Sequence, residues 1–180
     1  MGQWGNEAMT PGRVWMAIAG VAALLAVAFT VRTGAPVPAA APERVNLAVT
    51  LKDMNGADVR LDSFAGRPML INLWATWCGP CRLEMPQLID LYAKFKDRDL
   101  VMIGVSVDDT PELIRPFAKE FSVTYPLLVG LGHEDFLAAL GYTGGVPMTL
   151  FVKKDGTIAE RVNGIATTMS MERRILALFE

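Results

Sequence analysis

Hydrophobic and polar positions from residue 44 onward follow two alternating periods. Short, nearly continuous apolar runs are typical of strands buried on both faces, and they occur at residues 69–73, 100–107, 125–129 and 148–152. Apolar residues three or four positions apart predict helices at residues 81–95, 110–121, 134–140 and 170–179. Strands that alternate with helices in this way predict an α/β domain with a mixed central sheet flanked by helices.

Strand-like alternation and turn residues predict a hairpin at each end of this domain. Residues 45–51 and 59–61 alternate on either side of Asn55-Gly56, which is a strong signal for a two-residue turn. Residues 148–152 meet residues 157–162 across a second turn that contains Asp155-Gly156. The apolar residues expected to face the core from the helices include Leu83, Leu88, Leu91, Tyr92, Phe95, Leu113, Ile114, Phe117, Phe121, Ile175, Leu176 and Phe179.

The N-terminal pattern is different, because residues 14–31 are uncharged and bounded by Arg13 and Arg32. At about 1.5 Å per residue this run spans roughly 27 Å, which is enough to cross a bilayer. We interpret it as a transmembrane anchor after a tail of residues 1–13. A cleaved signal peptide is the alternative, with a cleavage site near Ala40, but the run is long and that site lies well beyond its end. Residues 32–43 contain three prolines and predict an extended linker to a domain of residues 44–180.

Charge excludes one class of partner. The chain has 17 basic and 19 acidic residues, a net charge of −2, and neither sign forms a long run. Nucleic-acid binding requires a basic patch or stripe, so we expect no nucleic-acid partner.

Both cysteines lie in one motif, Trp77-Cys78-Gly79-Pro80-Cys81, between a predicted strand and a predicted helix. Pro80 suits a first helical turn, so Cys78 is expected at the helix N-terminus, where free backbone N–H groups favour a thiolate. A thiolate at Cys78 can attack a disulfide, and Cys81 is near enough to resolve the mixed disulfide, with its sulfur more buried. A purely structural disulfide would close a very short loop and constrain little of the unfolded chain.

A carboxyl group is predicted beside this motif. Glu84 lies three residues after Cys81, so both project from the same helix face. If partly buried, its pKa is raised and it can accept the proton that Cys81 must lose. The alternative is an exposed charge near a helix N-terminus. The other carboxylate pair, Asp108-Asp109, is interpreted as turn and capping chemistry with no catalytic role.

The sequence WATWCGPC, followed by Glu84 and Pro86 and later by Gly145-Val146-Pro147-Met148-Thr149, closely resembles proteins of the thioredoxin fold. It is most similar to the membrane-anchored TlpA, ResA and CcmG group of thiol-disulfide oxidoreductases. The resemblance implies a thioredoxin fold with an added N-terminal hairpin and a strand-helix insertion at residues 110–129, preceded by one transmembrane helix.

The resemblance also implies roles for individual residues. Cys78 is the attacking thiol, Cys81 the resolving thiol and Pro147 the cis-proline of the family, and Trp77, Val146 and Pro147 bound the substrate pocket. Thioredoxin has a buried aspartate where this chain has Asn72, which cannot titrate, so the acid-base role is expected to fall to Glu84.

The expected function is that of a protein disulfide reductase that uses no cofactor. Its direction is inferred from Gly79-Pro80, as in thioredoxin. The anchor at residues 14–31 and the linker predict a single-pass protein of the cell membrane, with the catalytic domain facing the periplasm or extracytoplasmic side. The group includes reductants of apocytochrome c and of copper-site proteins, with cytochrome c maturation the preferred role. An upstream membrane thiol donor is expected to regenerate the dithiol.

Two alternatives use the same cysteines differently. Cys78 and Cys81 form half of a zinc or copper site, and Met85 and Met148 are soft ligands that would suit Cu(I). The only histidine, His133, is expected in an exposed loop, so no built metal site is predicted. A peroxidase of the peroxiredoxin type would need Pro-x-x-x-Thr-x-x-Cys, but Ile71 and Ala75 occupy the proline and threonine positions.

Overall fold

The computed structural model describes residues 43–180. The predicted tail at 1–13, the anchor at 14–31 and residues 32–42 of the linker lie outside the described residues. Among the helices of residues 43–180, none has the length and apolar character needed to cross a membrane.

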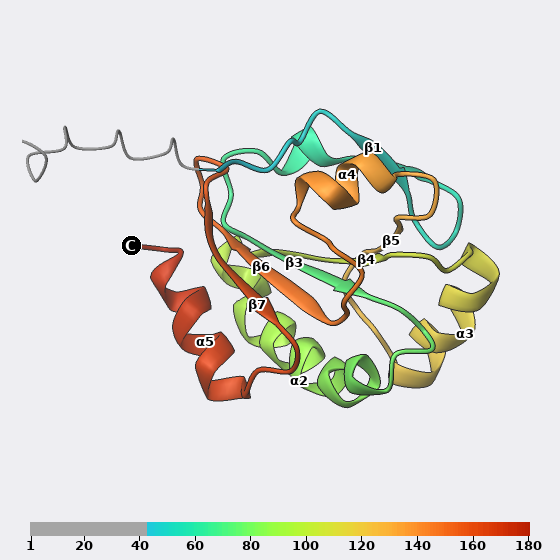
Figure 1. The fold of residues 1–180 in the computed structure, drawn as a ribbon. Helices are drawn as coiled ribbons and strands as arrows, with labels where there is room; N and C mark the ends of the chain where they lie inside the picture. The colour runs from blue at the N-terminus through green and yellow to red at the C-terminus, as the bar shows by residue number, and fades with distance from the viewer. Residues whose placement is uncertain (1–42) are drawn as a thin grey trace, which may run out of the picture. The chain divides into compact units, whose positions relative to one another are not determined.

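A five-stranded mixed sheet forms the centre of the fold (Figure 1). Its strands lie in the order β5-β4-β3-β6-β7, with β3 parallel to β4, β4 parallel to β5, and the pairs β3–β6 and β6–β7 antiparallel. All residues of β3, β4 and β6 are buried, which explains their continuous apolar sequences. The bounds are β3 Met69–Trp74, β4 Val101–Ser106, β5 Leu127–Val129, β6 Met148–Val152 and β7 Ile158–Asn163.

Helices cover both faces of this sheet. Figure 1 shows α2 and α5 below the sheet, and α4 with the N-terminal hairpin above it. The insertion after β4 supplies α3 and β5, as predicted, and α3 packs beside the sheet end through Trp74 and Phe117, whose ring centroids are 4.5 Å apart. The helix bounds are α2 Gly79–Phe95, α3 Pro111–Phe121, α4 Glu134–Ala139 and α5 Thr168–Ala177.

The N-terminal hairpin is present but its first strand is shorter than predicted. Only Thr50–Lys52 (β1) pairs with Asp58–Arg60 (β2), around a turn in which Gly56 has a φ of 87°. The chain before β1 is held elsewhere, because the Val45 backbone N–H donates to the Gly156 carbonyl (3.0 Å) in the C-terminal hairpin turn. Residues 45–48 therefore connect the two hairpins, and the N-terminal hairpin resumes at Val49, whose carbonyl accepts a hydrogen bond from the Leu61 backbone N–H (3.0 Å).

Three residues predicted to face the core are exposed. Leu83, Leu113 and Leu176 keep 71%, 53% and 39% of their surface accessible. Each follows or precedes a core position by one residue, and one residue turns the side chain by about 100° around a helix. The core-facing residues of α2 are Cys81, Glu84, Met85, Leu88, Leu91 and Phe95.

Candidate active site

The two cysteines form a disulfide at the start of α2. The Cys78–Cys81 S–S distance is 2.04 Å, and the two Cα atoms are 5.2 Å apart. Cys78 is the N-cap of α2, and its Sγ accepts a hydrogen bond from the Cys81 backbone N–H (3.1 Å). The predicted position of Cys78 at a helix N-terminus is confirmed. The same N–H group and the helix dipole would stabilise a thiolate on Cys78 once the disulfide is reduced.

The exposure of the two cysteines differs less than expected. Cys78 keeps 3% and Cys81 2% of its surface accessible, so the expected greater burial of Cys81 is not seen in the disulfide form. Their surroundings differ more, because Trp77, Gly79 and Pro80 around Cys78 are all exposed. A protein that reaches this disulfide must approach over Cys78.

The loop that precedes β6 lies at the same end of the sheet as the disulfide. Leu73 near the end of β3 pairs with Met148 at the start of β6, so residues 144–147 adjoin the segment that leads to Cys78. The Val146–Pro147 peptide bond is cis, as the resemblance implied. An open cavity of about 230 Å³ lies against this loop and is lined by Gly141, Thr143, Gly145, Val146, Pro147, Met148, Asn163 and Gly164.

The third residue of the predicted pocket lies toward the other neighbouring strand. The indole N–H of Trp77 donates to both carboxylate oxygens of Asp108 (3.0 Å each), and Asp108 follows β4. Since β4 and β6 lie on opposite sides of β3, Trp77 and the Pro147 loop flank the disulfide segment from two sides. The three predicted pocket residues therefore meet at one end of the sheet.

Glu84 is fully buried beneath this end of the sheet. Its Oε1 accepts a hydrogen bond from the Ala166 backbone N–H (3.3 Å), and its Oε2 accepts one from the Asn72 side-chain amide (3.5 Å). Asn72 also donates to Thr149 Oγ1 (3.1 Å), which fixes the amide. Burial raises the pKa of Glu84, although the hydrogen bonds from Ala166 and Asn72 oppose the rise. The alternative of an exposed helix charge is therefore wrong.

A buried phenol lies near Glu84. The Tyr125 hydroxyl donates to Met85 Sδ (3.0 Å), and both residues are buried. Burial and the nearby negative charge of Glu84 raise the pKa of Tyr125, so this phenol stays neutral. Met85 and Met148 are core residues, at 1% and 3% exposure. Within residues 43–180, His, Cys, Asp and Glu form no group of three that could hold a metal ion.

The structure assigns the Asp108-Asp109 pair a different place from the one expected. Asp109 is 2% exposed, and its carboxylate accepts hydrogen bonds from the Thr76 backbone N–H (2.7 Å), Thr76 Oγ1 (2.7 Å) and Ser106 Oγ (2.6 Å). These bonds, with the Trp77–Asp108 contact, hold the segment immediately before Cys78. The turn role is confirmed by the contact of Asp109 with Ser106 three residues earlier, whereas the capping role is not, because the N-cap of α3 is Thr110. One signal was available in the sequence, because the carboxyl ends of neighbouring parallel strands meet at one sheet edge.

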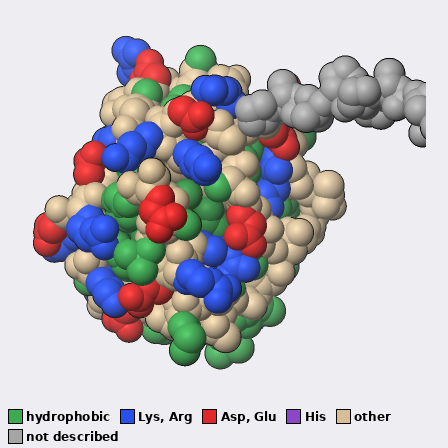
Figure 2. Space-filling model, turned by 90° about the vertical axis from the view of Figure 1, so that its left-hand side faces the viewer, with side chains coloured by type: hydrophobic (Ala, Val, Ile, Leu, Met, Phe, Trp, Pro, Cys, Tyr) green, Lys and Arg blue, Asp and Glu red, His purple; other side chains and the backbone are tan. Residues whose placement is uncertain are grey.

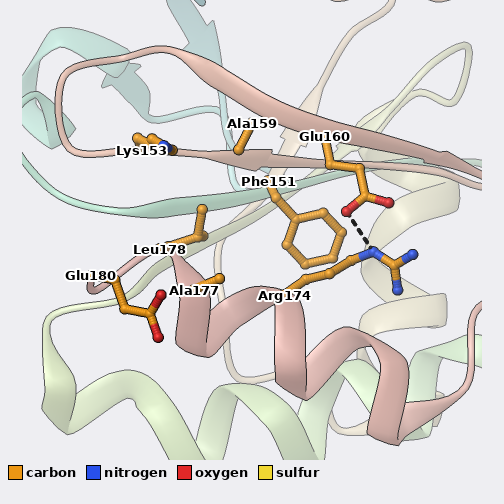
Figure 3. A pocket seen from close by; sticks show the side chains of 8 residues that line it. All are labelled: Phe151, Lys153, Ala159, Glu160, Arg174, Ala177, Leu178 and Glu180. Atoms are coloured by element: carbon orange, nitrogen blue, oxygen red, sulfur yellow. Dashed lines mark ion pairs between the residues drawn. The ribbon is translucent and has the colours of Figure 1, made fainter.

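Another cavity, of about 350 Å³, lies between α5 and the β6–β7 pair (Figure 3). Figure 3 shows the Phe151 ring on its floor and an ion pair between Arg174 and Glu160, whose Nε and Oε2 are 2.8 Å apart. Phe151 pairs with Leu70 near the start of β3, whereas Cys78 follows the end of that strand. This cavity is therefore not part of the candidate active site.

Sequence comparison relates the chain to redox proteins. A profile described as the AhpC/TSA family matches residues 41–161. The thiol-disulfide oxidoreductase ResA of Oceanobacillus iheyensis is 34% identical over 121 residues, which cover 67% of this chain and 62% of that protein. The ResA of Bacillus thuringiensis subsp. konkukian is 30% identical over 130 residues, which cover 72% of this chain and 73% of that protein. The match thus spans less than two thirds of the first relative and more than two thirds of the second.

Comparison with solved structures agrees with the sequence comparison. DsbF of MTB, solved in mixed oxidized and reduced forms, superimposes with a TM-score of 0.66 at 26% identity and covers 73% of this chain and 96% of its own. A thioredoxin-family thiol:disulfide interchange protein from Chlorobium tepidum gives a TM-score of 0.71 at 19% identity, with 78% and 99% coverage. At 19% identity the second likeness shows the fold alone.

Proposed function

Because this chain belongs to the AhpC/TSA family and is a thiol-disulfide oxidoreductase of the ResA type, we propose that it reduces disulfides in specific proteins outside the cytoplasm. The observation that carries this proposal is the Cys78–Cys81 pair at the N-terminus of α2. In the proposal, residues 14–31 tether the domain to the membrane, and the residues that follow extend it away from the bilayer.

The reaction begins with the reduced dithiol. The Cys78 thiolate attacks one sulfur of a client disulfide, forms a mixed disulfide and expels the client's second sulfur as a thiolate, which takes up a proton. Glu84 then accepts the proton of Cys81. The Cys81 thiolate attacks Cys78 Sγ and the mixed disulfide breaks. The client's remaining sulfur leaves as a thiolate and takes up the proton that Glu84 received from Cys81, so the client is released as a dithiol. One client disulfide is reduced for each Cys78–Cys81 disulfide formed, and an upstream membrane thiol donor reduces that disulfide again.

The direction of transfer is testable through the redox potential of the Cys78–Cys81 couple. We expect a reducing couple after equilibration of the detergent-solubilised chain in glutathione buffers. A potential near that of thioredoxin, about −270 mV, supports a reductant, whereas one near that of DsbA, about −120 mV, reverses the direction. Tight Cu(I) binding without reduction of protein disulfides would instead support the metal-handling alternative. Peroxidase activity is not expected, because Ile71 and Ala75 replace the residues that a peroxiredoxin motif requires.

The proposed clients keep paired thiols free for haem or metal, which an oxidising compartment would otherwise convert to disulfides. Apocytochrome c is the first choice, and copper-site proteins are the second. Replacing Cys81 by Ser removes the resolving thiol, so the mixed disulfide on Cys78 should accumulate and identify the client by mass spectrometry. If Cys81 forms the adduct in a Cys78→Ser chain and Cys78 forms none, the assignment of attacking and resolving thiols is wrong.

The side of the membrane has its own test. An alkaline phosphatase fused to the C-terminus should be active if the domain faces the periplasm. An inactive phosphatase fusion together with a fluorescent cytoplasmic reporter fusion would place the domain in the cytosol and contradict the proposed location.

A further inference from the structure

A buried amide stands between Glu84 and a buried hydroxyl group of the central sheet. Asn72 of β3 is 1% exposed, and its amide nitrogen donates to Glu84 Oε2 (3.5 Å) and to Thr149 Oγ1 (3.1 Å). Thr149 is fully buried on β6, directly opposite Asn72 in the antiparallel register of the two strands. The carboxyl group of Glu84 therefore contacts the sheet through two neutral polar side chains.

The strands that carry these two side chains are otherwise apolar. β3 has the sequence MLINLW and β6 the sequence MTLFV, and all of their residues are buried. Burying an asparagine and a threonine costs free energy of desolvation that leucine and valine would not cost. Replacing two such partners by apolar groups of the same shape is nearly neutral or stabilising. Folding of the sheet does not require polar groups at Asn72 and Thr149, so we relate them to the carboxyl group that Asn72 contacts.

A buried carboxyl group that exchanges a proton needs a different partner in each of its two states. The carboxylate accepts hydrogen bonds, whereas the protonated group must also donate one. The Asn72 amide can serve both states, because a turn of about 180° exchanges its NH₂ donor for its carbonyl acceptor. The Thr149 hydroxyl can follow the turn, since it accepts from the NH₂ group or donates to the carbonyl. A leucine in place of Asn72 would serve neither state.

Among the described residues, two other titratable groups lie near Glu84. Cys81 lies one turn earlier on α2, and Tyr125, which precedes β5, stays neutral because burial raises the pKa of its phenol. The contacts from β3, β6 and the loop after β7 come from the Asn72 amide, the Thr149 hydroxyl and a backbone N–H, which do not titrate. Figure 2 shows positive and negative side chains interspersed on one face of the molecule, where water and salt screen their effect on a buried group.

We propose that Asn72 and Thr149 are positioning residues for the proton transfer from Cys81 to Glu84. The Asn72 amide donates to the ionised carboxylate, and when the proton arrives the amide turns over and accepts a hydrogen bond from the protonated carboxyl group. Thr149 changes from acceptor to donor at the same time. Only hydrogen bonds change in this turn, and the one proton that moves goes from Cys81 Sγ to the Glu84 carboxylate. This inference rests on the proposed function and deepens its resolving step.

The test follows the resolving step on the reduced, detergent-solubilised full chain. An equimolar aromatic disulfide probe, dithiobis(nitrobenzoate), reacts with Cys78, which releases one coloured thiolate and keeps the other half as a mixed disulfide. Attack of Cys81 on Cys78 Sγ then releases the second coloured thiolate. Stopped-flow absorbance gives the rate of this second release as a function of pH, and we expect it to rise as Glu84 ionises.

Asn72→Leu should raise the midpoint of this pH profile by about one unit, a tenfold change in the proton affinity of Glu84. The ionised form loses a hydrogen bond to a charged group, whereas the protonated form loses a weaker neutral one. Thr149→Val should raise the midpoint by less, since the amide stays but loses its support. Both replacements keep the apolar character of their strands. The control is a Glu84→Gln background, in which Asn72→Leu should not move the profile.

Infrared spectroscopy tests the turn of the amide itself. The carbonyl band of protonated Glu84, identified by its absence in Glu84→Gln, should lie at lower wavenumber in the wild type than in Asn72→Leu, because only the wild type offers an amide carbonyl to its O–H group. The same wavenumber in both chains would refute the turn.

The kinetic outcomes separate this inference from the proposed function. Coincident midpoints for the wild type and Asn72→Leu, with the second thiolate released by both, would refute the positioning role and leave the reductase function in place. A shift that persists in the Glu84→Gln background would also refute it, since Asn72 would then act on a group other than Glu84. A wild-type chain that never releases the second thiolate would overturn the proposed function and this inference together.

Discussion

Asp109 offers the sharpest test of how the segment before Cys78 is held. Its carboxylate accepts three hydrogen bonds, two from Thr76 and one from Ser106. Bonds to a charged group contribute about 1.5–3 kcal/mol each, and a buried donor left without a partner costs about as much. In this variant the hydroxyl of half-buried Thr76 can turn to donate to water instead. The Thr76 backbone N–H and the Ser106 hydroxyl are left without an acceptor, so they account for most of the lost stability. We expect Asp109→Ala to cost about 3 kcal/mol.

For a domain of this size that cost lowers the melting temperature by roughly 10 °C. Thermal unfolding followed by circular dichroism measures it, with Asp109→Asn and Ser106→Ala as graded controls. Asparagine keeps the volume and one acceptor oxygen, and Ser106→Ala removes a single donor, so both should cost about 1–2 kcal/mol. An Asp109→Ala chain that melts with the wild type would show that other contacts hold the Thr76 segment.

The same variants separate positioning from bulk electrostatics. Removing the negative charge of Asp109 would by itself favour the Cys78 thiolate and lower the pKa of Cys78. A loosened Thr76 segment instead lets Cys78 leave the helix N-cap, which removes its N–H donor and raises that pKa. We expect Asp109→Ala to shift the pH dependence of iodoacetamide alkylation of reduced Cys78 upward, and Asp109→Asn to leave it unchanged or lower it. A downward shift in both variants would refute the positioning role.

Two further predictions follow from buried groups near the sheet. Burial raises the folded-state pKa of Glu84, so the stability that protonated Glu84 contributes is fully present below its unfolded pKa of about 4.3 and is lost as pH rises through its folded pKa. In urea unfolding from pH 4 to 8, Glu84→Gln should therefore gain stability relative to the wild type as pH rises. A difference in stability that stays constant with pH would contradict this assignment. Gly130→Ala would place a Cβ 2.6 Å from the Ser106 carbonyl oxygen, so we expect a loss of about 2 kcal/mol; Gly145→Ala, whose Cβ meets nothing within 4 Å, should melt like the wild type.

Periodicity was sufficient to predict most of the fold, because strands buried on both faces are nearly continuously apolar and helices repeat every three to four residues. The active cysteines were predictable for a local reason, since both lie within one turn of the same helix. Glu84 was predictable in the same way, from its spacing to Cys81. The faces of the helices were less predictable, because exposed Leu83 is followed directly by buried Glu84.

Asp109 shows what a local pattern does not reveal. A carboxylate between a strand and a helix is usually a turn or capping residue, and nothing in its immediate sequence distinguishes it. Its role depends on the parallel pairing of β3 with β4, which brings Ser106 opposite Trp74 and so places Asp109 beside Thr76. The path of the chain before β1 likewise depends on a contact distant in sequence, the hydrogen bond from the Val45 backbone N–H to the Gly156 carbonyl.

The two buried carboxyls near the disulfide, Asp109 and Glu84, accept hydrogen bonds from different donors. This difference suits them to different roles. Asp109 accepts three short hydrogen bonds from groups on β4 and on the segment before Cys78, so its carboxylate ties these two segments together. Glu84 accepts only two long bonds, of 3.3 and 3.5 Å, and its burial favours the protonated form. A carboxylate held by short bonds suits fixing a backbone, whereas one with a raised pKa suits exchanging a proton. The proposed transfer of a proton from Cys81 to Glu84 would therefore leave the segment that positions Cys78 in place.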